Sequence, residues 1–135
     1  MRDRLGRVSA ERLVCGHGLT EIHAVLTGQE VDDQILWTQA LAGAPETAGS
    51  LDRYCGLLGA VAGDLALAQG ADGVVIGGGL GLRLAEILPQ SSFQASFRAK
   101  GRFAARMAQL PVKLIAHPQP GLLGAAAAFA AAYPT

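Results

Sequence analysis

The stretch that most constrains the fold is residues 71–79, which reads Ala-Asp-Gly-Val-Val-Ile-Gly-Gly-Gly. Residues 73–76 have the composition of a short buried strand, and they lead directly into three consecutive glycines. Because glycine has no Cβ, such a strand end lets the backbone approach whatever lies beyond it. In α/β proteins the carboxyl end of a strand is where ligands bind. The stretch therefore favours a ligand site, with a nucleotide as the favoured ligand.

The three glycines fit neither of the common phosphate-binding motifs. If Gly77 and Gly79 open the dinucleotide fingerprint, its last position holds Leu82, and a start at Gly79 places Leu84 there. The Gly-Lys-Ser/Thr ending of a P-loop does not follow the triplet either. A tight turn between a strand and a helix explains these glycines as well as a ligand does, so both interpretations stay open at this point.

One other segment has the composition of a strand, namely residues 111–117. Periodicity and capping signals predict helices at residues 20–26 (capped by Thr20), 33–41, 50–69 (opened by Ser50), 80–88, 92–100, 102–109 and 122–132. Two strands separated by helices predict a parallel, right-handed crossover. A parallel sheet needs further strands and cover on both faces. We therefore expect an α/β fold of few parallel strands and many helices, the beginning of which lies outside this chain.

The predicted helix at residues 50–69 has one apolar face, with three glycines among its residues. The face consists of Leu51, Tyr54, Cys55, Leu58, Val61, Ala62 and Leu65. Gly56, Gly59 and Gly63 each cost about 1 kcal/mol of helix stability relative to alanine. We therefore expect another helix or a sheet edge to approach this helix closely, and Gly70 to end it.

Composition and charge exclude several classes of function. Eleven basic residues balance eleven acidic ones without a block of like charge, so nothing indicates binding to nucleic acid or to an anionic membrane. The amino terminus has no apolar signal region, and the apolar run at residues 122–133 is too short to span a membrane. Cys15 and Cys55 lack the spacing of zinc ligands, so we expect two reduced thiols in a soluble, cytoplasmic protein.

Polar residues at four places could carry chemistry, and each place also has an ordinary structural explanation. Glu11 could accept hydrogen bonds from sugar hydroxyls or lie in solvent. Residues 15–18, Cys-Gly-His-Gly, could cradle a phosphate or ribose, with His17 as an acid or base, or form a simple loop. Residues 100–102 could contact phosphate or form a surface turn. His117 follows the second strand, where it could serve a site or end the strand.

Six segments, taken in their order along the chain, resemble the carboxyl-terminal part of the bacterial glucokinases. They are residues 8–13 (VSAERL), 15–19 (CGHGL), 63–67 (GDLAL), 75–79 (VIGGG), 97–103 (FRAKGRF) and 117–125 (HPQPGLLGA). The first and the last of these segments are the most specific. The resemblance covers nearly the whole chain, with the motifs in the order that the family has them.

The resemblance implies the actin-like, ribonuclease H-like ATPase fold, in which two α/β domains close around Mg-ATP and a sugar. Residues 1–135 would then be part of the carboxyl-terminal domain, and the amino-terminal domain is absent. The implied reaction is transfer of the γ-phosphoryl group of ATP to the 6-hydroxyl of glucose, a cytoplasmic step of glycolysis. The resemblance assigns sugar binding to Glu11, adenosine binding to Gly77, Gly78 and Gly79, and a place beside the nucleotide to Gly16 and Gly18.

This chain departs from the family pattern in three respects. Residues 15–18 stand where the family usually has Ser-Gly-Pro-Gly, and residues 80–83 lack the proline that follows the family's glycine triplet. The family's aspartate base, its two phosphate loops and its Glu-Gly-Gly-His sugar motif precede the Ser-Ala-Glu segment, and nothing here matches them. Because phosphoryl transfer depends on positioning and charge around the γ-phosphate, we assign no catalytic residue and no metal ligand. We expect no turnover from this polypeptide alone.

Functions of three kinds remain open at this point. The first is a glucokinase segment that is active within the complete protein or beside a complementing amino-terminal half. The second is a non-catalytic module that keeps affinity for nucleotide or sugar, or that only forms a homodimer. The third is a degenerate remnant with an incomplete sheet. A kinase of a related family that acts on another hexose is the nearest enzymatic rival.

Overall fold

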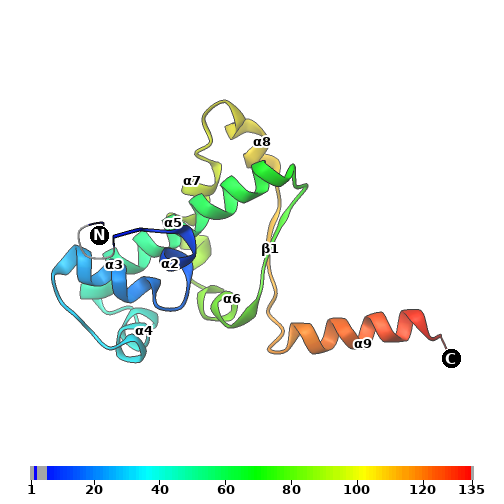
Figure 1. Ribbon diagram of the computed structural model, residues 1–135, viewed down its shortest axis with the longest axis horizontal. Helices are drawn as coiled ribbons and strands as arrows, with labels where there is room; N and C mark the ends of the chain where they lie inside the picture. Colours follow the sequence, from blue (N-terminus) through cyan, green and yellow to red (C-terminus); the bar gives the residue numbers. More distant parts are fainter. Residues whose placement is uncertain (1, 3–5, 135) are drawn as a thin grey trace.

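The computed structural model describes Arg2 and residues 6–134, and Figure 1 shows how their elements are arranged. The longest helix, α5, runs through the middle, with α2, α3 and α4 towards its first half and α7 along its second half. A two-stranded sheet leads from these helices to α9, which extends away from them. The elements are α2 (Ala10–Val14), α3 (Gly18–Thr27), α4 (Asp33–Leu41), α5 (Pro45–Gln69), β1 (Val74–Ile76), α6 (Gly78–Leu84), η1 (Leu88–Gln90), α7 (Phe93–Arg98), η2 (Gly101–Phe103), α8 (Ala104–Gln109), β2 (Val112–Leu114) and α9 (Pro120–Ala132).

The two predicted strands pair in parallel, as expected, but both are short. Val74 lies opposite Val112, and Ile76 lies opposite Leu114. The ladder continues by one hydrogen bond at each end, from the Val74 N–H to the Pro111 carbonyl and from the Ile115 N–H to the Ile76 carbonyl, both 2.9 Å. Residues 115–117, predicted as strand, lie beyond this ladder because β1 has already turned into α6.

Helix α5 begins earlier than predicted and ends where predicted. Pro45 is its first residue, a position at which the missing N–H of proline costs nothing. The prediction that Ser50 opens the helix is therefore wrong. Ser50 is buried inside it, with its hydroxyl 2.9 Å from Nδ1 of buried His23. Gly70 ends the helix in the left-handed conformation, with φ of +61°, which confirms its predicted role.

The glycines of α5 mark the contact with α7, which confirms that another helix approaches them. A Cβ at Gly59 would lie 2.2 Å from the Phe93 carbonyl oxygen, and one at Gly63 would lie 2.6 Å from that of Phe97. No side chain fits at these distances, so the cost of glycine in the helix is offset by close packing. Asp52 adds to the contact by accepting a hydrogen bond of 2.7 Å from the N–H of Ser92, at the start of α7.

The core lies between α5 and the helices around it. The ring of Trp37 meets that of Tyr54 edge to face, with centroids 5.5 Å apart. Cys55 is fully buried, which confirms its predicted place in the core. Leu65, predicted on the same apolar face, is instead 57% exposed, because the described elements cover that face over only part of the helix. The fully buried large apolar and aromatic side chains are Leu19, Ile22, Leu36, Tyr54, Leu84, Phe93, Phe97 and Met107.

Two more predicted helix boundaries are wrong for local reasons. Helix α3 begins at Gly18, so Thr20 is not its cap; its hydroxyl donates to Asp33 instead. Helix α6 begins inside the glycine triplet and ends at Leu84, after which Pro89 lies in the separate 3₁₀ turn η1. In both cases the helix begins at a glycine that the sequence prediction assigned to the preceding loop.

Other elements cover the two-stranded sheet and α9 less than they cover the remaining helices. Ile76, Val112 and Leu114 face Leu88 and Phe93 across a hollow of about 130 Å³. On the other face Val75 is 63% exposed. Helix α9 contains no buried residue. Within the part of the chain that the structure describes, no helix has both the length and the apolar character that a membrane crossing requires.

Candidate functional site

The glycine triplet forms the sharp turn from β1 into α6. Gly77 ends the strand, and a Cβ there would meet the Ile115 side chain at 3.2 Å. Gly78 has φ of +82°, a conformation that side chains rarely adopt. Gly79 has no positive φ, and a Cβ there, as at Gly78, would meet no atom within 4 Å. The turn thus accounts for Gly78 and partly for Gly77, whereas the glycine at 79 faces open space that a ligand could occupy.

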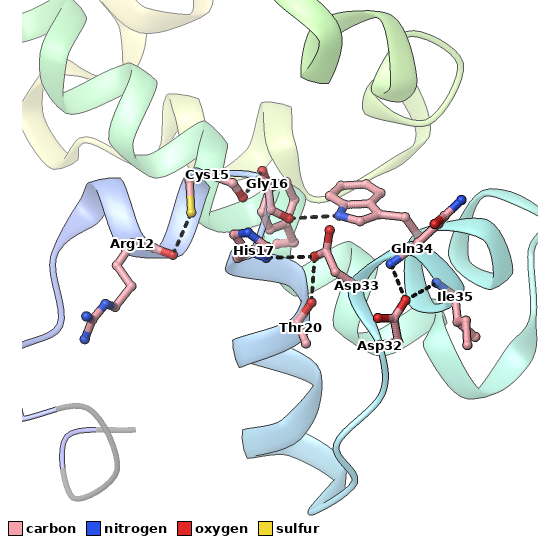
Figure 2. A network of polar contacts seen from close by, with 11 residues as sticks. Arg12, Cys15, Gly16, His17, Thr20, Asp32, Asp33, Gln34 and Ile35 are labelled. Atoms are coloured by element: carbon pink, nitrogen blue, oxygen red, sulfur yellow. Dashed lines mark hydrogen bonds and ion pairs between the residues drawn. The ribbon is translucent and has the colours of Figure 1, made fainter.

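Residues 15–18 connect α2 to α3, with Gly18 as the first residue of α3, and two aromatic donors hold this loop in place (Figure 2). The indole Nε1–H of Trp37 donates to the Gly16 carbonyl at 2.9 Å. The hydroxyl of Tyr54 lies 3.1 Å from both the Val14 and the Cys15 carbonyl oxygens. The backbone of this loop is therefore fixed from the core side by α4 and α5.

The two glycines of this loop have different structural roles. A Cβ at Gly18 would lie 2.0 Å from the Leu13 carbonyl oxygen, so packing alone requires glycine there. A Cβ at Gly16 would meet nothing within 4 Å, so its outer side is open. Of the two residues assigned to the nucleotide by resemblance, Gly16 is the one that leaves room for a ligand.

Asp33, at the start of α4, connects this loop to the next helix (Figure 2). It accepts a hydrogen bond of 2.8 Å from the Thr20 hydroxyl. Nδ1 of His17 lies 3.4 Å from the same oxygen, an ion pair when the imidazole is protonated. The His17 side chain is 82% exposed, so screening by water keeps such a pair weak. His17 is at the surface and has a carboxylate beside it.

Trp37 links the two predicted nucleotide segments and was not singled out from the sequence. The indole N–H of Trp37 donates a hydrogen bond to the Gly16 carbonyl. The Arg83 guanidinium of α6 lies 5.6 Å from the centroid of the same ring. Trp37 and Arg83 also line an open hollow of about 400 Å³ with Gln34 and Thr38. The sequence offered one signal, since Trp37 is the single tryptophan of the chain.

Glu11 lies apart from these loops, in the first turn of α2. Ser9 caps this helix by accepting a 3.2 Å hydrogen bond from the Arg12 N–H. The carboxylate of Glu11 is exposed and lines an open hollow of about 430 Å³ with Arg7, Ser9 and Arg12. This hollow shares no lining residue with the one at Trp37. The arrangement offers charged hydrogen-bonding groups of both signs to a small polyhydroxyl ligand.

The remaining polar candidates are engaged in local structure. Nζ of Lys100 bonds the Ala60 carbonyl at 2.8 Å and pairs with Asp64 at 2.8 Å, and its side chain is 10% exposed. Lys100 therefore fastens the end of α7 to α5, whereas Gly101 and Arg102 are exposed in the 3₁₀ turn η2, as expected of a surface turn. His117 is exposed, and its Nδ1 accepts from the Gln119 N–H at 3.1 Å.

Two buried acidic groups are kept neutral by their surroundings. Burial raises the pKa of the Tyr54 hydroxyl, and neighbouring Cys15 and Cys55 raise it further. Burial likewise raises the pKa of the Cys55 thiol. Both groups act as packing or hydrogen-bonding groups, not as bases or nucleophiles. Among the described residues, no three His, Cys, Asp or Glu side chains are grouped so that they could hold a metal ion.

Comparison with known proteins decides the family. The family model described as Glucokinase matches residues 1–132, nearly the whole chain. This chain belongs to the glucokinase family. The resemblance seen in the sequence is thereby confirmed as that of the family's carboxyl-terminal portion.

Similar glucokinases show how much of the family this chain represents. It is 54% identical over 140 residues to the glucokinase of Zymomonas mobilis subsp. mobilis, a match that covers 98% of this chain and 43% of that protein. It is 41% identical over 134 residues to the glucokinase of Xanthomonas campestris pv. campestris, covering 94% of this chain and 40% of the relative. The chain therefore spans about two fifths of the length of these glucokinases.

A solved glucokinase structure shares the fold. The crystal structure of a glucokinase from an Antarctic psychrotroph superimposes with a TM-score of 0.81 and 33% identity, over 94% of this chain and 42% of the other. The expected fold class is confirmed: the chain is a mostly helical α/β portion of the actin-like ATPase fold, with two parallel strands.

Proposed function

We propose that this chain is the part of a glucokinase that carries adenosine- and sugar-binding groups. In the complete protein, the γ-phosphoryl group of ATP would be transferred to the 6-hydroxyl of glucose, a cytoplasmic step of glycolysis that yields glucose 6-phosphate. The observation that carries this proposal is the 54% identity to the Zymomonas glucokinase over 98% of the chain. Glucose and ATP are the proposed small-molecule partners.

The proposed nucleotide site consists of Gly77, Gly78 and Gly79 together with Gly16 and Gly18. Its support is the open space at Gly79 and Gly16, and the Trp37–Arg83 contact that joins their elements. The backbone there could lie directly against adenosine. ATP would bring Mg²⁺ on its phosphates, and the described residues offer no carboxylate cluster for that ion.

The proposed sugar-binding residue is Glu11. Its carboxylate is exposed at the hollow that Arg7 and Arg12 also line, so two hydroxyls of a sugar could donate to it. A carboxylate that accepts from hydroxyls fixes the orientation of a sugar without taking part in the bond changes. We propose a binding role for Glu11 and no catalytic role for any residue of this chain.

A non-catalytic binding module is the second candidate function. The observation that favours it is length, because the chain covers only 40–43% of the glucokinases it resembles. Phosphoryl transfer requires groups placed around the γ-phosphate, and our sequence comparison finds no counterpart here of the base or the phosphate loops. The polypeptide alone would then bind without turnover.

Isothermal titration with Mg-ATP and then with glucose, beside a coupled phosphorylation assay, tests both candidates. Gly79→Ala adds a Cβ where the chain has no atom within 4 Å, so it should weaken Mg-ATP binding at least tenfold without harming the fold. Gly49→Ala, at another open helical glycine, is the matched control. Glu11→Gln should weaken glucose binding about tenfold or more, because a charged hydrogen bond is worth about 1.5–3 kcal/mol. Glu86→Gln, at another exposed carboxylate, should leave it unchanged.

The outcomes separate the candidates. Binding of both ligands without turnover supports a binding part that needs the rest of the enzyme. Turnover by the chain alone would contradict our view that the missing loops are indispensable. If neither ligand produces heat, the proposed sites are wrong and the chain keeps only the fold of its family.

A further inference from the structure

Trp37 is a buried side chain that contacts both segments of the proposed nucleotide site. Its indole Nε1–H donates to the Gly16 carbonyl at 2.9 Å, and the Arg83 guanidinium lies 5.6 Å from its ring centroid. The side chain is only 3% exposed, and its ring meets that of Tyr54 with an angle of 86° between the two planes. Contacts with three neighbours therefore hold this ring in one orientation.

Trp37 and Tyr54 turn three successive carbonyl groups of the loop towards the core (Figure 2). The Tyr54 hydroxyl lies 3.1 Å from the Val14 and Cys15 carbonyl oxygens, and Trp37 bonds the next carbonyl, that of Gly16. In a trans peptide the N–H points opposite to the carbonyl. The N–H groups of residues 16 and 17 therefore point away from these two rings. Within the part of the chain that the structure describes, neither N–H donates a hydrogen bond.

Arg83 brings the second segment to the same ring. It lies four residues after Gly79 on α6, so the two residues share one side of that helix. Its side chain is exposed, and its guanidinium forms no ion pair with any described residue. A planar guanidinium stacks well on an aromatic face and also donates to phosphate oxygens. Trp37 thus keeps a cation with unused donors on the side of α6 that carries Gly79.

We infer that Trp37 is a positioning residue of the nucleotide site. It directs the His17 N–H outward and holds the Arg83 guanidinium beside Gly79, so that both groups donate to oxygen atoms of Mg-ATP. Trp37 itself is buried and acts through these two donors. The inference rests on the proposed function in taking residues 16–18 and 77–79 as the nucleotide site. It adds the side chain that sets the geometry of both segments.

Trp37→Phe tests the first of these two donors. It keeps an aromatic ring but removes the indole N–H, so the Gly16 carbonyl loses its anchor and the peptide can rotate. In isothermal titration of the full chain, the affinity for Mg-ATP should fall about fivefold, the value of one hydrogen bond. The affinity for glucose should stay unchanged, because the hollow at Glu11 shares no lining residue with the one at Trp37.

Thr47→Val is the matched control for this variant. The Thr47 side chain is buried, and its hydroxyl donates to the Ala44 carbonyl at 2.8 Å, away from both nucleotide segments. Both variants thus remove a buried donor to a backbone carbonyl, and both should lower the urea midpoint. Only Trp37→Phe should lose affinity for Mg-ATP, which separates positioning from a general loss of stability.

Arg83→Gln tests the second donor without a change in the core. Because Arg83 is exposed, the variant should fold normally, and its affinity for Mg-ATP should fall about tenfold or more with the loss of a charged hydrogen bond. Arg53→Gln, at an exposed arginine of α5, makes the same charge change and should leave the affinity unchanged.

The fluorescence of Trp37 gives a readout that a structural role alone would not change. Trp37 is the single tryptophan of the chain, so the emission reports on this ring alone. Mg-ATP should shift the emission of the natural chain, because the bound phosphates draw Arg83 away from the ring. The shift should be lost in Arg83→Gln and kept in Arg53→Gln.

The outcomes distinguish this inference from the proposed function. If the natural chain binds Mg-ATP and Trp37→Phe binds it equally well, the inference is wrong and the nucleotide site stands. The same holds if Trp37→Phe and Thr47→Val lose equal affinity. If Trp37→Phe does not fold, Arg83→Gln decides, and an unchanged affinity overturns the inference. A natural chain that binds no Mg-ATP contradicts the proposed site and the role of Trp37 together.

Discussion

Helices α5 and α9 are both rich in small residues, yet they use them differently. In α5 the glycines allow α7 to approach until backbone meets backbone, and the contact is complete within the described chain. In α9 a Cβ added at either glycine would meet no atom within 4 Å, the alanines are exposed, and no residue of the helix is buried. Small residues in a helix therefore permit a close neighbour, and within the described chain only α5 has one.

The largest expected effect concerns Gly59, at the completed contact. Gly59→Ala would place a Cβ 2.2 Å from the Phe93 carbonyl oxygen, so α7 must move away from α5. Overpacking of this kind costs about 1–3 kcal/mol, and we expect a loss at the upper end because backbone, not a flexible side chain, must shift. Urea unfolding followed by circular dichroism measures the free energy of unfolding.

Gly124→Ala in α9 is the matched variant for this comparison. It adds the same methyl group to a helical glycine, but a Cβ there meets nothing within 4 Å. Because alanine favours the helix by about 1 kcal/mol over glycine, the variant should be neutral or more helical. Equal destabilisation by the two variants would show that our distinction between the packed and the uncovered helix is wrong.

The same distinction explains what could be predicted from the sequence. The glycines of α5 correctly predicted a close approach, and the β-branched runs correctly predicted two parallel strands, because both signals are local. The face containing Leu65 was overestimated, since periodicity marks apolar residues whether or not a partner covers them. The prediction that Ser50 opens α5 is wrong because Pro45, five residues earlier, also fits the first turn of a helix.

The candidate site was partly accessible to sequence reasoning. The glycine turns at 16–18 and 77–79 could be found from their composition, and the open space at Gly16 and Gly79 is consistent with that reading. The contact between these turns could not be found, because it depends on Trp37 and Arg83, which lie far apart in the sequence and meet only in the folded chain. Residues joined by tertiary packing leave no periodic signal.

A smaller loss of stability is expected where Tyr54 of α5 bonds the backbone beside the loop at residues 15–18. Tyr54→Phe removes the hydroxyl that lies 3.1 Å from the Val14 and Cys15 carbonyl oxygens and leaves the ring in the core. Loss of a buried hydrogen-bond donor costs about 1–3 kcal/mol, and we expect about 1–2 because Val14 and Cys15, the acceptors, are only half-buried. Urea unfolding measures it.

The control for this variant is Tyr133→Phe, at the tyrosine beyond α9, the side chain of which is 67% exposed. It removes the same hydroxyl from the uncovered part of the molecule, so the free energy of unfolding should not change. If both variants lose the same stability, the hydrogen bonds from the Tyr54 hydroxyl to the Val14 and Cys15 carbonyls do not stabilise the protein.

The smallest effect is a pH dependence that arises in the packed part alone. Burial raises the pKa of the Cys55 thiol above its ordinary 9.0, so the unfolded chain releases this proton first as pH rises. The stabilising effect of the neutral thiol is complete below pH 9.0 and is lost as pH rises towards the folded pKa.

We expect the urea midpoint to fall more steeply above pH 9 in the natural chain than in Cys55→Ala, which has no thiol to ionise there. Equal slopes in the natural chain and Cys55→Ala would mean that the buried thiol is not linked to unfolding, and that the alkaline loss comes from Tyr54, the pKa of which burial also raises.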